Sequence, residues 1–205
     1  DTLADFHAVD PVPLGLDALG KPDGFMERQV RGWTQRYERA RTHDVAAAEA
    51  VAKWLAESLP ESPPATLLHN DWRLDNMALD PADPGRCIAV YDWDMCTVGD
   101  PFADVGTVFA SWANPGEVGF GATPMPTHLP GWLTREAALE RYAARSGRDV
   151  GGFDYYLVFG IFKMAVVLQQ IYFRYARGQT QDARFAGMAQ VAQAMFESAA
   201  TRLPA

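Results

Sequence analysis

The sequence has little positive charge and no long uncharged apolar segment, and both shortages narrow its possible functions. Lysine and arginine supply 18 of the 205 residues against 26 aspartates and glutamates, so the formal net charge is −8. A surface that binds nucleic acid needs a basic excess to neutralise phosphates, so we expect no nucleic-acid partner. The longest apolar run, 155–173, contains Lys163, Gln169 and Gln170. These polar residues favour a buried helix over a membrane span.

Cysteine is also scarce. Cys87 and Cys96 do not have the spacing of metal ligands, so we expect two reduced, half-buried thiols, with a disulfide as the alternative.

The sequence has no recognisable signal peptide, which predicts a cytoplasmic protein that contacts no membrane. At 48% hydrophobic residues the chain can still bury a sizeable core.

The hydrophobic pattern predicts an α+β fold that is mainly helical, with a small insert of short strands. Helices are expected at 25–41, at 45–58, after Pro101, and at 134–146, 153–177 and 181–202. Strands are expected at 66–69, 77–79 and 87–91, with a hairpin turn over 80–85. Residues 1–24, rich in Pro and Gly, are expected to be irregular, and 113–132 to form one long loop. Asp44 and Thr134 are expected to cap helices, and Gly147 to end one.

Polar side chains gather where two of these strands end, in 67-LLHNDWRLDNMAL-79 and 88-IAVYDWDMCTVGDP-101. Asp71 follows one strand, Asn76 comes five residues later, and Asp92 ends the neighbouring strand. A loop of this length can bring a carboxylate and a carboxamide to one place. Asn and Asp oxygens, completed by water and phosphate oxygens, are how proteins commonly hold Mg²⁺.

Arg73 lies between Asp71 and Asn76 and is a permanent cation that could face phosphates. The alternative is a structural ion pair of Arg73 with Asp75, Asp94 or another carboxylate. Phosphoryl transfer needs a base, Mg²⁺ and such a cation, so the pattern is typical of that chemistry.

The spacing H-x-D-x-x-x-x-N, formed by His69, Asp71 and Asn76, is that of the protein-kinase catalytic loop, and Asp92 stands where the D-F-G aspartate would. Together LLHNDWRLDNM and AVYDWDMCTVGDPFADVG resemble the aminoglycoside-phosphotransferase-like kinases, whose usual form is H-G-D-x-R-x-x-N, then D-W-E or D-W-D, G-D-P and D-L. The lead-in FHAVDP and LGKPDGFMERQVRGWTQRYERA looks most like the branch fused to acyl-CoA dehydrogenases. The resemblance covers most of 1–112 and fades toward the C-terminus.

The resemblance implies a protein-kinase-like fold and a role for each motif residue. Asp71 would be the catalytic base and Arg73 would contact the phosphates of the nucleotide. Asn76 and Asp92 would bind Mg²⁺ and, through it, ATP or another nucleoside triphosphate. The acceptor would be a hydroxyl-bearing small molecule, with a hydroxyacyl-type metabolite favoured by the acyl-CoA dehydrogenase branch.

A kinase of this type also needs an N-terminal lobe, and the sequence shows no Gly-rich turn between strands before His69. The chain starts at Asp1 rather than at a methionine. We therefore expect a C-terminal lobe only, a fragment whose missing N-terminal lobe would be its partner. By itself it should bind nucleotide weakly and show little turnover. Its expected parts are a helical lead-in (1–60), catalytic and metal-binding loops (65–100) and a helical substrate-side subdomain (101–205).

Several residues keep two interpretations. His69 is expected to hold the loop by packing and a hydrogen bond. Asp100 is expected to cap the helix that follows and to hold the catalytic loop's backbone, and Asp104 to be structural. Asp94 is either a support for the site or part of an exposed turn. Asn70 replaces the family's usual Gly, which alters a backbone position.

Two further groups could serve either structure or substrate. The aromatics beside the long loop are core, lid or substrate-contacting residues: Trp112, Phe120 and Trp132. The arginines of 25–41 form a solvated helix face or a basic patch for an anionic acceptor: Arg28, Arg31, Arg36, Arg39 and Arg41.

Two other functions remain open from the sequence. One is a non-catalytic kinase-like binding module, and the other is a metal-dependent hydrolase that uses the same carboxylates on water.

Overall fold

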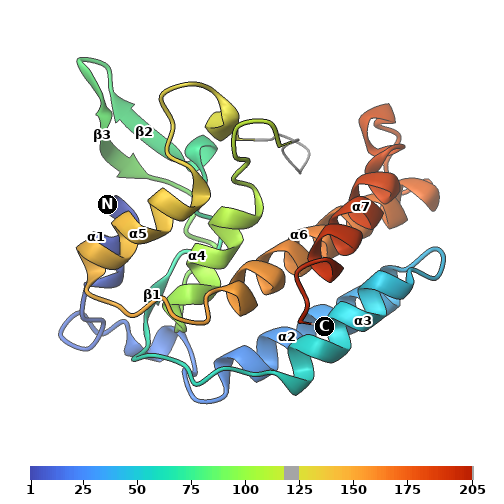
Figure 1. Cartoon of the computed structure of the whole chain (residues 1–205), viewed down its shortest axis with the longest axis horizontal. Coiled ribbons are helices and arrows are strands. Elements are labelled where there is room, and N and C mark those ends of the chain that lie inside the picture. Colours follow the sequence, from blue (N-terminus) through green and yellow to red (C-terminus); the bar gives the residue numbers. More distant parts are fainter. Residues whose placement is uncertain (118–124, 205) are drawn as a thin grey trace.

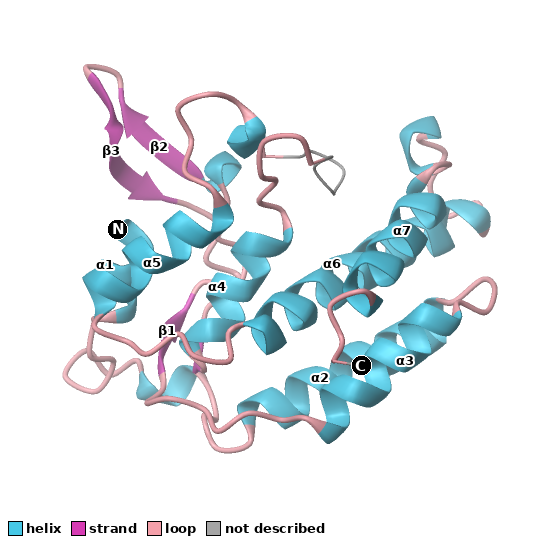
Figure 2. Cartoon of the chain, viewed as in Figure 1, coloured by secondary structure: helices cyan, strands magenta, loops and turns pink. Residues whose placement is uncertain are grey.

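The computed structural model describes residues 1–117 and 125–204. Its α-helices are α1 (Thr2–His7), α2 (Phe25–Ala40), α3 (Ala46–Glu57), α4 (Pro101–Ala110), α5 (Arg135–Ser146), α6 (Asp154–Ala176) and α7 (Met188–Ala200). Its strands are β1 (Thr66–Leu68), β2 (Met77–Asp80), β3 (Asp83–Val90) and β4 (Thr97–Gly99). Short 3₁₀ turns lie at Asp17–Leu19, Leu74–Asn76, Pro126–His128 and Ala183–Phe185. The mainly helical α+β prediction is confirmed (Figures 1 and 2).

Helix α6 is the centre of the core. It packs against α4 on one side and against α2, α3 and α7 on the others (Figure 1). Phe159, Phe162 and Val166 have 1% exposure or less, as expected for a helix with neighbours on several sides. By length and composition α6 could also cross a membrane, but 67% of its most apolar window is buried inside the fold. Its apolar surface is therefore used for packing.

The four strands form two separate antiparallel pairs. β2 and β3 make a hairpin, in which Met77 lies opposite Val90. β1 pairs with β4, with Leu67 opposite Val98. The hairpin confirms the predicted strands at 77–79 and 87–91, and β1 the one at 66–69. The turn is shorter than the predicted 80–85, because β3 already begins at Asp83. β4 was not predicted, because its three residues (97–99) are too few to show an alternating pattern and end in glycine.

Most predicted helix ends are confirmed. The Thr134 side chain accepts a hydrogen bond from the Ala137 N–H, and Gly147 ends α5 with φ of 68°. Asp44, however, does not cap α3: Val45 holds the N-cap position and makes no side-chain capping bond. The Asp44 carboxylate is exposed and lies 3.4 Å from the Arg41 guanidinium. The capping prediction for Asp44 was therefore wrong, because the side chain pairs with a cation at the end of α2.

The prediction of an irregular stretch over 1–24 was wrong at its start, where α1 forms. This helix has only six residues and would be unstable alone. Two ion pairs attach it to α5: Arg141 Nε lies 2.8 Å from Asp1 Oδ1, and Arg145 Nε lies 2.7 Å from Asp5 Oδ1. Contacts between residues about 140 positions apart therefore stabilise α1.

The described parts of the predicted long loop are anchored to the helices. Thr127 Oγ1 accepts from the Ala113 N–H at 2.9 Å, and the Trp112 indole donates to the Leu133 carbonyl at 3.0 Å. Trp112 packs against the core, and Trp132 lies 6.0 Å from it, ring centre to ring centre. Phe120 lies outside the described residues.

Candidate functional site

The loop after β1 is anchored by a buried carboxylate from α4. Asp104 accepts hydrogen bonds from the backbone N–H groups of His69 and Asn70, both at 2.7 Å, and its Oδ2 lies 3.4 Å from His7 Nε2. Burial alone would raise the pKa of Asp104. The hydrogen bonds from His7 and His69 and the charge of Lys163 outweigh burial and lower the pKa below its ordinary value. Asp104 therefore stays ionised while it holds the loop.

This anchoring had been expected of Asp100, and that part of the prediction was wrong. Asp100 does cap α4, since its carboxylate accepts from the Phe102 N–H at 2.9 Å. Its other oxygen accepts from the Tyr156 hydroxyl at 2.7 Å. One turn of helix separates the two aspartates, and only Asp104 faces the loop.

Asn70 has a left-handed backbone, with φ of 66°. Glycine adopts this conformation most easily and asparagine is among the few other residues that tolerate it. The departure from the H-G-D pattern therefore keeps the loop's shape. The Asn70 side chain also donates to the Met95 carbonyl at 3.0 Å, which attaches the first motif to the second.

His69 has the structural role that was expected. It is fully buried, its Nε2 bonds to the Tyr91 carbonyl at 2.9 Å, and its Nδ1 accepts from the Asp71 N–H at 3.2 Å. Because Nδ1 accepts, we assign the proton to Nε2. The ring also packs against Trp72 and Trp93, at centre-to-centre distances of 5.6 and 4.8 Å. One imidazole thus supports both motif loops.

Asp71 and Asn76 are in direct contact. The Asn76 side-chain N–H donates to the Asp71 backbone carbonyl at 2.8 Å and to Asp71 Oδ2 at 3.0 Å. These two bonds use the amide nitrogen and fix the orientation of the Asn76 side chain. The other polar atom of the amide is Oδ1, which can ligate a metal. The spacing had suggested that the two side chains share one place, and the structure brings them there.

Asp92 is attached to the same loop through its neighbour. The Tyr91 N–H donates to the Asn76 carbonyl at 2.8 Å, and Tyr91 in turn accepts from His69. Asp92 itself has a left-handed backbone, with φ of 63°, and an exposed side chain. Such a conformation costs about 1 kcal/mol for a residue other than glycine and is often found at functional sites.

Asn76 and Asp92 offer oxygen atoms of the kind that Mg²⁺ prefers. Among the described residues, no group of three or more His, Cys, Asp and Glu side chains is arranged to hold a metal by itself. Mg²⁺ usually takes one or two protein carboxylates or amides and fills its shell with water and phosphate oxygens. This donor set is therefore suitable for a metal delivered with a nucleotide.

Arg73 and Asp94, the remaining charged residues of the motifs, lie in different surroundings. Arg73 Nη2 lies 3.2 Å from Asp75 Oδ2, which matches the expected alternative of a structural ion pair. Asp94 is exposed and lines a cavity beside the loop. The cysteines are both free and half-buried, as expected.

Lys163 belongs to this region and was not predicted to. Its Nζ lies 3.2 Å from the Asn70 carbonyl and 3.4 Å from Thr107 Oγ1, and the residue is 6% exposed. Burial lowers its pKa, while the carboxylates of Asp104 and Asp71 act in the opposite direction. Its position as the one lysine in the apolar run 155–173 was the available signal, because a buried lysine needs polar partners.

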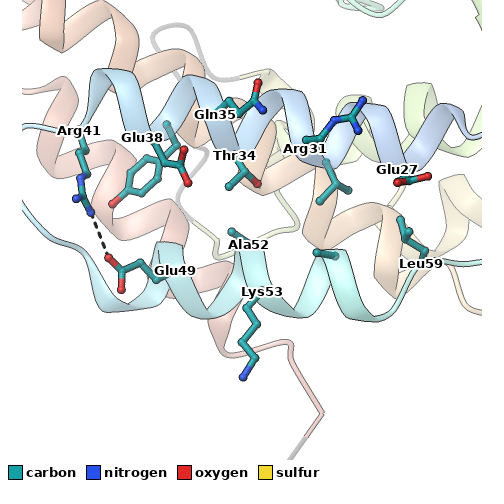
Figure 3. A pocket seen from close by; sticks show the side chains of 13 residues that line it. Glu27, Arg31, Thr34, Gln35, Glu38, Arg41, Glu49, Ala52, Lys53 and Leu59 are labelled. Atoms are coloured by element: carbon teal, nitrogen blue, oxygen red, sulfur yellow. Dashed lines mark hydrogen bonds and ion pairs between the residues drawn. The ribbon is translucent and has the colours of Figure 1, made fainter.

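Two cavities lie on the two sides of α2. The α2–α3 groove has a volume of about 730 Å³ (Figure 3). Its lining comprises Glu27, Val30, Arg31, Thr34, Gln35, Tyr37, Glu38, Arg41, Glu49, Ala52, Lys53, Ala56 and Leu59. The second, which we name the loop-side cavity, has a volume of about 660 Å³. Its lining comprises Lys21, Phe25, Arg28, Gln29, Gly32, Trp33, Arg36, Asn70, Asp94, Met95, Thr97 and Lys163. Only the loop-side cavity includes residues of the two motifs.

Comparison with solved structures finds the same fold in a crystal structure from Ralstonia eutropha JMP134, a protein assigned to the aminoglycoside phosphotransferases. The TM-score is 0.88 and the sequences are 29% identical. The match covers 98% of this chain and 61% of that one. The kinase-like fold expected from the motifs is thereby confirmed in its overall form.

Among curated proteins, the chain is 32% identical over 200 residues to mouse acyl-CoA dehydrogenase family member 10 and 30% identical over 203 residues to human acyl-CoA dehydrogenase family member 11. These matches cover 96% and 97% of this chain but 19% and 26% of the two relatives. The chain thus spans about a quarter or less of these proteins. The model of the phosphotransferase enzyme family, APH, matches residues 1–153. The chain therefore belongs to the APH phosphotransferase family.

Proposed function

We propose that the protein carrying this chain transfers the terminal phosphoryl group of ATP, or of another nucleoside triphosphate, to a hydroxyl of a small molecule. The observation that supports this most is the direct pairing of Asp71 with Asn76, with Asp92 attached to the same loop through Tyr91. A base and two oxygen ligands at one loop are what phosphoryl transfer requires of this part of a kinase.

Each motif residue has one task in this proposal. Asp71 accepts the proton of the acceptor hydroxyl, with its carboxylate oriented by Asn76. The oxygens of Asn76 and Asp92 hold Mg²⁺, which when bound offsets negative charge on the nucleotide phosphates. Arg73 contacts the transferred phosphoryl group and offsets its negative charge. The ion pair of Arg73 with Asp75 holds the guanidinium beside the catalytic loop.

The rest of the proposal concerns the whole protein. An N-terminal lobe supplied by the same protein completes the nucleotide site, and the described chain acts as the C-terminal lobe with residues 101–205 on the substrate side. The relatives' acyl-CoA dehydrogenase names favour a hydroxyacyl-type acceptor. We place the reaction in the cytoplasm, without a membrane or nucleic-acid partner.

The test is Asp71→Asn in the natural protein that contains this sequence, with phosphoryl transfer measured against a panel of hydroxyl acceptors. Loss of a general base should reduce turnover by about a hundredfold to ten-thousandfold, while the dissociation constant for Mg-nucleotide changes little. Asp83→Asn, an exposed hairpin residue, is the matched control and should retain activity.

Equal activity of Asp71→Asn and the parent protein would remove Asp71 as the base. Turnover that needs the metal but no nucleotide would indicate the hydrolase. Nucleotide or acceptor binding without turnover by the natural protein would indicate the binding module.

A further inference from the structure

We propose that the loop-side cavity is an anion site, which binds a carboxylate or phosphate group carried by the same molecule that presents its hydroxyl to Asp71. This inference rests on the proposed function for its link to catalysis. The binding of an anion in the cavity can nevertheless be measured without any reaction.

The charges that line the cavity are unbalanced. Its basic residues are Lys21, Arg28, Arg36 and Lys163, and its single acidic residue is Asp94. The Arg28 guanidinium already donates to the backbone carbonyls of Lys21 and Asp23. The Lys163 ammonium likewise donates to the Asn70 carbonyl at 3.2 Å. Within the described residues the Arg36 guanidinium makes no hydrogen bond, so Arg36 is the arginine of this cavity best able to bind a ligand.

Arg36 and Lys163 approach the same aromatic ring from different helices. The Arg36 guanidinium carbon lies 4.7 Å from the centre of the Trp33 ring, and Lys163 Nζ lies 5.7 Å from it. Within the part of the chain that the structure describes, no carboxylate forms an ion pair with Arg36. A cation that contacts a ring and no carboxylate remains able to bind an anion.

The two cations also repel each other. Burial is the main reason why the pKa of Lys163 is lowered, and the charge of Arg36 lowers it further. An anion placed between them would offset this repulsion and favour the charged form of Lys163. A bound anion would therefore reduce the repulsion between Arg36 and Lys163.

The backbone of α2 leaves room for the guanidinium. A Cβ atom at Gly32 would lie 3.1 Å from the Arg36 Nη1 atom, closer than an ordinary van der Waals contact. Glycine inside a helix costs about 1 kcal/mol relative to alanine. Without a Cβ atom at position 32, the Arg36 guanidinium can lie against α2 without a shift of a few tenths of an ångström.

The cavity ends next to the proposed base. Lys163 contacts the carbonyl of Asn70, the residue that directly precedes Asp71, and the Asp71 charge raises the pKa of Lys163. An acceptor whose anionic group lies near Arg36 and Lys163 would therefore have its hydroxyl within reach of the loop. This arrangement selects hydroxyl compounds with a negative charge over neutral or cationic ones.

The first experiment uses three probes of similar size and different charge: 3-hydroxypropionate, 1,3-propanediol and 3-amino-1-propanol. Binding to the natural protein that contains this sequence is measured by calorimetry without nucleotide or Mg²⁺. We expect 3-hydroxypropionate to bind at least about tenfold more tightly than the other two, because hydrogen bonds to charged groups are the stronger ones. Glycerol 3-phosphate tests whether phosphate is preferred to carboxylate.

Two variants locate the binding. Arg36→Gln should weaken 3-hydroxypropionate binding about tenfold, and it should fold normally because the side chain is exposed. Arg31→Gln is the matched control, since it makes the same charge change on the other side of α2. It should leave binding unchanged.

Equal binding of the three probes, or equal weakening by Arg36→Gln and Arg31→Gln, would overturn the anion site. The proposed function and the anion site can fail independently of each other. If 3-hydroxypropionate binds through Arg36 while Asp71→Asn has no effect on turnover, the anion site stands and the catalytic proposal falls. If neutral hydroxyl compounds are phosphorylated as well as anionic ones, the catalytic proposal stands and the anion site falls.

Discussion

The two cavities beside α2 have similar volumes, about 730 and 660 Å³, but different chemistry. The α2–α3 groove has charges of both signs, with Glu27, Glu38 and Glu49 against Arg31, Arg41 and Lys53. In that groove the Arg41 guanidinium and the Glu49 carboxylate form an ion pair at 3.4 Å (Figure 3). The loop-side cavity is mainly basic and reaches the motif loops.

The comparison shows that volume alone does not identify a functional site. Residues of α2 line both cavities, one on each side of the helix. Of these two, only the loop-side cavity combines an excess of positive charge with a residue, Asn70, whose backbone is left-handed. This difference supports our proposal that the loop-side cavity, the smaller of the two, belongs to the functional site.

The largest expected effect is on Asp104, the anchor of the loop beside the loop-side cavity. Asp104→Ala removes a buried carboxylate that holds two loop N–H groups and faces His7 and Lys163, and should lower the free energy of unfolding by about 3–5 kcal/mol. Chemical denaturation measures this change, and hydrogen exchange should be fastest at residues 69–71.

Asp44→Ala is the control, because its ion pair with Arg41 is exposed and should contribute less than about 1 kcal/mol. If Asp104→Ala cost no more than this control, Asp104 would not be the anchor of the loop.

A second effect concerns pH. The pKa of Lys163 is lower in the folded protein than its unfolded value of about 10.4, so the unfolded chain binds more protons between those two values. Stability from this group therefore rises with pH in that window, by at most about 1.4 kcal/mol per pH unit. Asp104, Asp71 and Arg36 are the charged groups that face Lys163.

Lys163→Met should abolish this dependence, since methionine keeps the length of the side chain without its charge. The measurement is the difference in unfolding free energy between parent and variant from pH 7 to pH 10. A constant difference over that range would contradict the buried environment of Lys163.

The smallest effect is expected in the α2–α3 groove. Glu49→Gln removes the partner of Arg41 from an exposed ion pair and should change the free energy of unfolding by less than about 0.5 kcal/mol. It should leave 3-hydroxypropionate binding unaltered. A change in binding comparable with that of Arg36→Gln would mean that the two sides of α2 are not independent.

The sequence predicted the parts of the site that depend on local spacing. Asp71 and Asn76 are close because only four loop residues lie between them, and the β2–β3 hairpin brings Tyr91 and Asp92 back to the same loop. Such short-range relations can be inferred from the order of residues.

The parts that sequence reasoning missed depend on contacts between distant segments. Asp104 and Asp100 look alike in the sequence, and only the packing of α4 against the loop decides which one anchors it. Lys163 is 93 positions from Asn70, whose carbonyl it contacts. Helix α1 likewise forms in contact with α5, where Leu3, Ala4 and His7 are buried and two exposed ion pairs add to the contact. A single sequence without its tertiary contacts does not specify these choices.

The attachment of the loop to Asp104, His69 and Tyr91 has a consequence for the entropy of the reaction. A flexible loop would lose conformational freedom of about 1–2 kcal/mol per residue when it closed around a substrate. Here the N–H groups of His69, Asn70 and Asp71 and the carbonyl of Asp71 are already hydrogen-bonded within the fold. That ordering cost is met during folding, so more of the acceptor's binding energy remains available for positioning its hydroxyl.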